Sequence, residues 1–96
     1  MSRETYSLFP PGSLVVVTRG RHAGSLCVSL GVVDAENNAK ILIADGRRIR
    51  AGRPKRKNAR HVERTGVVLG EVAQRLARGE AIDDGWLCEV IARSGR

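Results

Sequence analysis

Turn-forming residues divide the first two thirds of this 96-residue chain into short apolar runs, and this punctuation restricts the fold more than any other feature. Two prolines and Gly12 precede residues 14–17, a short β-branched run. Residues 26–32 then alternate large apolar side chains with small ones, the pattern of a half-buried strand. Residues 40–44 form a third run. The segments predict a sheet of short strands.

Further turn signals follow the second and third runs. Residues 34–38 are polar and include two Asn, which tolerate a positive φ. Asp45-Gly46 predicts a two-residue hairpin that leads into a strand at residues 47–49. A last short extended piece is expected around residues 60–62. Five short strands are too little for a sandwich, and closure removes exposed edges. We therefore predict a mainly β fold, a small SH3-like five-stranded barrel over residues 13–65.

The hydrophobic period changes from Gly66 onward. Apolar residues then recur at helical spacing up to Gly79, which can cap the helix at its C-terminus. Asp83 can cap a second short helix at its N-terminus. Each helix needs a surface to cover, either the barrel or a second copy in a homodimer. Residues 66–96 are thus expected to form a short C-terminal two-helix extension, and residues 1–12 an N-terminal tail. The apolar residues of the two helices are Val68, Leu69, Val72, Ala73, Leu76, Trp86, Leu87, Val90 and Ile91.

Positive charge is concentrated in the middle of the chain. The net charge is +7, and residues 13–65 hold twelve Lys or Arg against four Asp or Glu, whereas residues 66–96 hold four against five. Residues 47–60 contain no acidic residue at all. Uncompensated charge at this density, beside a folded platform, indicates a polyanionic partner, although a solvated loop would show the same composition. We call this segment the basic run; its charged residues are Arg47, Arg48, Arg50, Arg53, Lys55, Arg56, Lys57 and Arg60.

The sequence lacks the residue patterns that several functional classes require. No apolar run approaches the roughly 20 residues that cross a bilayer, and the first residues lack the apolar core of a secretory signal, so we expect a cytoplasmic protein without membrane contact. Cys27 and Cys88 have no Cys or His at metal-ligand spacing and are expected to be buried, reduced thiols. The alternative, a disulfide that closes a long loop, is disfavoured in a reducing compartment. No Ser has an activating His or Asp arrangement. We expect neither an enzyme nor a metal or other cofactor.

A glycine turn lies between the first two predicted strands. Gly20 and Gly24 bracket a loop that, with the preceding Arg19, carries Arg21 and His22. Glycines let the backbone turn tightly or approach a ligand closely, so Arg19, Arg21 and His22 can face phosphates or simply occupy a turn. The sequence leaves both interpretations open. Gly46 is expected to serve the hairpin turn alone.

The scarcity of aromatic residues and the lack of a basic helix indicate which type of nucleic acid the protein binds. Tyr6, Phe9 and Trp86 are the only aromatic residues and lie outside the predicted barrel, so a stacking platform for single strands is not expected. A basic recognition helix for DNA is also missing, because the predicted helices lie in the near-neutral third. Binding through phosphates, 2′-hydroxyls and shape favours structured RNA.

Two segments in order resemble a known family. Residues 14–24, LVVVTRGRHAG, resemble the KOW motif of ribosomal proteins and transcription elongation factors. Together with residues 54–63, PKRKNARHVE, they are similar to the fourteen-e type of large-subunit ribosomal protein and to its small bacterial relatives. The resemblance covers roughly residues 12–65, and the two-helix tail also looks like that of the small bacterial members. It implies an SH3-like barrel that binds ribosomal or other structured RNA without catalysis.

These arguments together favour an RNA-binding, ribosome-associated protein, with ribosomal proteins as further neighbours. The alternative is a protein adaptor of the transcription or translation machinery, whose basic run meets an acidic surface. A third interpretation is non-specific DNA binding.

His61 is expected to close the barrel by hydrogen bonding. The predicted RNA contacts are Arg19, Arg21, His22, Arg47, Arg48, Arg50, Arg53, Lys55, Arg56, Lys57 and Arg60, and the structural turn residues are Gly20, Gly24 and Gly46.

Overall fold

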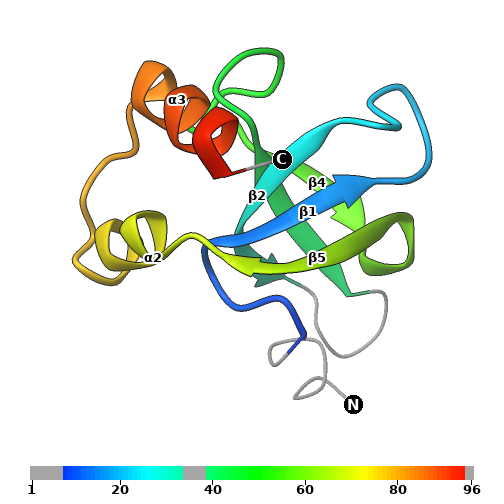
Figure 1. Cartoon of the computed structure of the whole chain (residues 1–96). Helices are drawn as coiled ribbons and strands as arrows, with labels where there is room; N and C mark the ends of the chain where they lie inside the picture. The colour runs from blue at the N-terminus through cyan, green and yellow to red at the C-terminus, as the bar shows by residue number, and fades with distance from the viewer. Residues whose placement is uncertain (1–7, 34–38, 95–96) are drawn as a thin grey trace.

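The computed structural model describes residues 8–33 and 39–94. Five strands form one antiparallel sheet in the order β4-β3-β2-β1-β5, and two helices follow them in the sequence (Figure 1). The mainly β prediction with two C-terminal helices is confirmed. The elements are β1 (Ser13–Val17), β2 (Leu26–Val33), β3 (Lys40–Ala44), β4 (Lys55–Asn58), the 3₁₀ turn η1 (Ala59–His61), β5 (Val62–Val68), α2 (Gly70–Ala77) and α3 (Asp84–Ser94).

The first three predicted strands are confirmed as β1, β2 and β3, while the polar turn expected at residues 34–38 lies outside the described residues. The half-buried character predicted for β2 is wrong in its first half, where Cys27, Val28 and Ser29 are all buried. Successive strand residues point to opposite faces, so both faces of β2 are covered there. The second cover is α3, which contacts β2 and buries three residues in the same core, Leu87, Val90 and Ile91.

The strand predicted at residues 47–49 is absent; this part of the chain is an irregular loop, and β4 begins only at Lys55. The carboxylate of Asp45 accepts hydrogen bonds from the backbone N–H groups of Arg47 (2.8 Å) and Ile49 (2.9 Å). The carbonyl of Ile49 accepts in turn from the N–H groups of Asp45 and Gly46. The loop closes on itself, because groups that a β-ladder would use are already paired.

Two further boundaries differ from the prediction. Residues 59–61 form η1, in which the side chain of Asn58 accepts from the N–H of Arg60 (3.0 Å), and the strand expected around residues 60–62 starts at Val62 instead. The helix expected from Gly66 begins at Gly70, because β5 continues to Val68, which pairs with Ser13 of β1. Two β-branched residues next to a paired strand extend it in preference to starting a helix.

Local capping agrees with the expectation for both helices. The N–H groups of Gly79 and Glu80 donate to the carbonyls of Leu76 and Arg75, which forms a Schellman cap with Gly79 at φ 72°. The carboxylate of Asp83 accepts from the N–H of Trp86 (2.9 Å) at the start of α3.

Among the described residues, no helix is long and apolar enough to cross a membrane. Both helices bury apolar residues against the sheet, as expected if they cover it.

Candidate nucleic-acid interface

The glycine turn joins β1 to β2 and is held by its own backbone. Gly20 and Gly24 both have φ 89°, a region that residues with a Cβ rarely adopt. The N–H of Gly24 donates to the carbonyl of Val17 (2.7 Å), and the N–H of Ala23 donates to that of Gly20 (3.1 Å). Both glycines therefore serve the turn. The side chains of Arg19 and Arg21 are exposed beside it.

Lys57 of β4 reaches across to this turn. Its ammonium group donates a hydrogen bond to the carbonyl of Arg19 (3.1 Å), and a Cβ built on Gly20 would lie 2.6 Å from the same nitrogen. The N–H of Thr18 also donates to the carbonyl of His61 in η1 (2.8 Å). The two sequence segments that indicate a polyanion thus lie together, although about forty residues separate them in the chain.

The loop between β3 and β4, residues 45–54, which we call the basic loop, carries the first half of the basic run and is fastened to α3 (Figure 1). The N–H of Ala51 donates to the carboxylate of Asp84 (2.8 Å) in the first turn of the helix. Gly46, expected to serve the turn alone, also lies so close to α3 that an added Cβ would stand 3.0 Å from the N of Cys88. The helix therefore shapes the basic loop, a role the sequence did not indicate.

The basic side chains do not all share one face. Lys55, Arg56 and Lys57 are consecutive residues of the edge strand β4, so Lys55 and Lys57 point to one side and Arg56 to the other. Arg50 and Arg53 are exposed in the loop, where the N–H of Arg53 donates to the carbonyl of Arg50 (3.0 Å). The run wraps around an edge of the sheet.

No ion pair in the part of the chain that the structure describes neutralises a charge of the basic run. The two ion pairs found there join Arg78 to Glu80 and Arg93 to Glu71, each at 3.8 Å, and both lie in the C-terminal third. The charges of the run and of the turn are therefore available to an external anion.

A hollow of about 490 Å³ separates the glycine turn from α3. We call it the α3 groove. Its walls come from three separate parts of the chain, which none of the sequence patterns connected. It is lined by residues 23–26 of the turn and β2, by Asp45, Arg47 and Arg48 of the basic loop, and by Cys88, Ile91 and Ala92 of α3.

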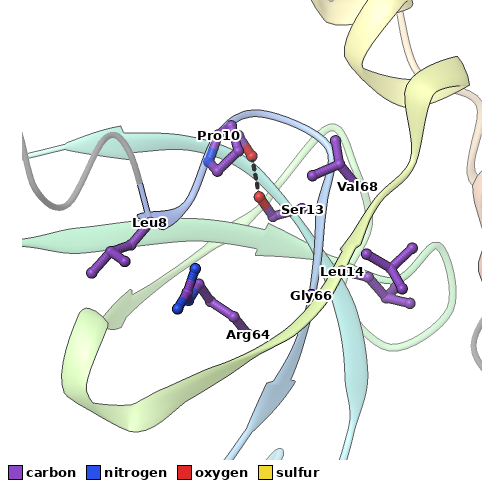
Figure 2. Close-up of a pocket in the computed structure, with 8 residues that line it drawn as sticks. Leu8, Pro10, Ser13, Leu14, Arg64, Gly66 and Val68 are labelled. Carbon is purple, nitrogen blue, oxygen red and sulfur yellow. Dashed lines mark hydrogen bonds between the residues drawn. The ribbon is translucent and has the colours of Figure 1, made fainter.

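A second, smaller hollow lies beside β5, between the N-terminal segment and the strand (Figure 2). Its rim holds exposed apolar side chains, Leu8, Val67 and Val68, and its one charged lining residue is Arg64. Leu8 and Arg64 lie toward one end of the hollow and Val68 toward the other. With a single charge and no pair of titratable groups, its lining does not suit acid–base chemistry.

The two histidines and the buried cysteine that the sequence singled out lie within the folded part of the protein. His22 is half-buried, and its Nδ1 atom is buried without a hydrogen-bond partner among the described residues. His61 ties η1 to the end of β1 through its backbone carbonyl, which accepts a hydrogen bond from the N–H of Thr18.

Burial, reinforced by the carboxylate of Asp45, raises the pKa of the Cys27 thiol to about 12. Within residues 8–33 and 39–94, no three His, Cys, Asp or Glu side chains cluster closely enough to hold a metal ion.

The structure thus brings Arg19, Gly20 and Lys57 together. Gly24, Arg47 and Arg48 all line the α3 groove. The sequence did not single out Asp84, which holds the basic loop, or Ala92, which lines the groove. It predicted Cys88 only as a reduced thiol and Ile91 only as an apolar helix residue, not as parts of this surface. The only sequence signal for Asp84 and Ala92 was the helical spacing of their neighbours. A scan against models of protein families and a search of curated proteins each found no match.

Proposed function

We propose that this chain is an RNA-binding protein of the KOW type, which associates with structured RNA and in particular with ribosomal RNA. The observation that carries the proposal is the contact between Lys57 and Arg19, because it brings part of the basic run against the glycine turn and its arginines. Arg can grip a phosphate with two parallel hydrogen bonds, and Lys adds point charges.

An SH3-like barrel is part of the same proposal. Its support is the strand order, in which β5 returns beside β1 after a meander from β1 to β4. The short turn η1 leads directly from one edge strand, β4, to the other, β5. Closure between these edges would remove the two exposed strand edges that an open sheet leaves.

The test is the salt dependence of binding to a structured ribosomal RNA fragment. If about 4–6 basic residues contact phosphates, log affinity should fall against log salt with a slope of roughly −3 to −5. A slope near zero contradicts the proposal. Equal affinity for duplex DNA would favour the non-specific interpretation, and binding to ribosomal particles that survives nuclease treatment would favour the adaptor.

Two double variants with the same change in charge locate the surface. Arg50→Gln with Arg53→Gln removes two charges from the basic loop, whereas Arg78→Gln with Arg93→Gln removes two exposed charges from the C-terminal third. Exposed ion pairs contribute little to stability, so both proteins should fold. The first pair should weaken RNA binding and lower the salt slope by about 1 to 2. Equal effects of the two pairs would contradict a localised interface.

A further inference from the structure

We propose that the α3 groove binds one unpaired nucleotide of the RNA, with its phosphate on Arg47 and Arg48 and its base between the glycine turn and α3. This inference rests on the proposed function and adds the class of RNA that the site prefers, a helix interrupted by a bulged or looped-out nucleotide. The hollow of about 490 Å³ lies within the range of pockets that hold small organic ligands.

Small residues on both walls leave room for a base. Gly24 has no side chain, and a Cβ built there would meet nothing within 4 Å, so the turn backbone is open at this point. The facing wall is α3, where the short side chain of Ala92 is exposed next to the nearly buried Ile91. Leu26, which is half-buried, and the small exposed part of Ile91 supply apolar surface for the flat face of a base.

The charges at the groove suit a nucleotide more than an apolar ligand. Arg47 and Arg48 are exposed on its rim and belong to neither ion pair of the described residues. Their backbone is held by Asp45, whose Oδ1 atom accepts from the N–H groups of Arg47 and Ile49. The second carboxylate oxygen retains capacity to accept from an exocyclic amino group of a base.

An unpaired nucleotide fits this site better than a duplex does. The major groove of an RNA helix is too deep and narrow for side chains to read, whereas splayed-out bases can stack on Arg guanidinium planes. The one aromatic ring of α3 is already engaged, because the guanidinium of Arg75 lies 4.0 Å from the ring centroid of Trp86. Stacking in the groove would therefore use guanidinium and aliphatic surfaces.

The experiment compares two hairpin RNAs with the same stem, one fully paired and one with a single bulged nucleotide, by fluorescence anisotropy. The wild type should bind the bulged hairpin about tenfold more tightly, a difference of about 1.4 kcal/mol that burial of part of one base against aliphatic and guanidinium surfaces can supply. Ala92→Leu places a larger side chain where the base would lie, without changing charge, and should reduce this preference to near one. Ala77→Leu makes the same change at an exposed position of α2 and should keep the preference.

Equal affinity of the wild type for both hairpins would overturn the inference while leaving the proposed function intact. A preference that survives in Ala92→Leu would also overturn it, because the groove would then be the wrong place. Binding to neither hairpin would overturn the proposed function and this inference together.

Alkylation of Cys88 gives a second readout on the unaltered protein. Cys88 lines the groove and is partly exposed, whereas Cys27 is completely buried, so iodoacetamide should label Cys88 selectively. Saturation with the bulged hairpin should slow labelling about fivefold or more, and saturation with the paired hairpin should not. The same rate with both RNAs would contradict an occupied groove.

Discussion

Lys57 donates a hydrogen bond from its ammonium group to the backbone carbonyl of Arg19, at 3.1 Å. The bond ties the edge strand β4 to the glycine turn between β1 and β2, and the Lys57 side chain lies over Gly20, where a Cβ would obstruct it. Because the turn offers a carbonyl and the strand a cation, the contact does not neutralise charge. It holds two basic segments together without consuming their positive charge.

The first prediction separates this tie from charge alone. Lys57→Met and Lys55→Met each remove one charge from the same side of β4, and each should lower the salt slope for RNA binding by about 0.7–0.9. Only Lys57→Met also breaks the bond to the turn, so its affinity should fall about 2- to 12-fold further, as a hydrogen bond worth about 0.5–1.5 kcal/mol implies. Equal losses, measured by titration at several salt concentrations, would contradict a role for the tie.

The second prediction compares two glycines with positive φ. Gly24→Ala should lower the free energy of unfolding by about 1–2 kcal/mol, the strain of a left-handed residue, because a Cβ there meets open space. Gly46→Ala should lower it more, because its Cβ would clash with the backbone carbonyl of Asp84 at the start of α3. Urea denaturation with a common slope measures both losses. Similar losses would show that α3 does not press on the loop.

The third prediction concerns Asp84, an acidic residue next to a basic loop. By charge alone, Asp84→Ala should strengthen binding to RNA. We expect it to weaken binding, because the N–H of Ala51 loses its acceptor and the loop is no longer held on α3. Asp84→Asn keeps an acceptor oxygen and should preserve affinity. Independently of RNA, hydrogen exchange at the Ala51 amide should be faster in Asp84→Ala than in Asp84→Asn.

Asp83→Ala is the matched control for Asp84→Ala. Asp83 caps the same helix through the N–H of Trp86, and its loss should cost about 1 kcal/mol of stability without releasing the loop. If Asp83→Ala and Asp84→Ala weakened RNA binding equally, the effect would come from the helix as a whole and not from the bond to Ala51.

The fourth prediction is a dependence of stability on pH. Burial and the nearby carboxylate of Asp45 raise the pKa of the Cys27 thiol to about 12, so the folded state favours the neutral thiol. In the unfolded chain the thiol ionises at about pH 8.5. Its contribution is therefore complete below that pH and is lost as the pH rises toward 12. Between pH 7.5 and 10.5, the wild type should lose more unfolding free energy than Cys27→Ala, measured by urea denaturation. The same slope in both proteins would contradict the shift.

Much of the fold could be read from local chemistry. The β-branched run before the glycine turn predicted β1, and Asp83 and Gly79 predicted where one helix begins and the other ends. These signals succeed because their partners are only a few residues away. Asp45-Gly46 failed as a hairpin signal because the Asp45 carboxylate pairs with N–H groups of the next residues, which turns the chain away from a strand.

Composition and local pattern specify the kinds of surface that this protein has: an uncompensated basic run, a glycine turn with flanking arginines, and a near-neutral helical end with apolar faces. They do not reveal that Lys57 meets Arg19, that Asp84 holds the basic loop, or that α3 forms one wall of a groove with Arg47 and Arg48; these contacts arise from the folded arrangement. The difference lies in the distance along the chain over which each signal acts. Composition and period report what each segment can bury or expose, whereas these contacts join segments about thirty to forty residues apart, whose meeting depends on how the whole sheet and α3 pack.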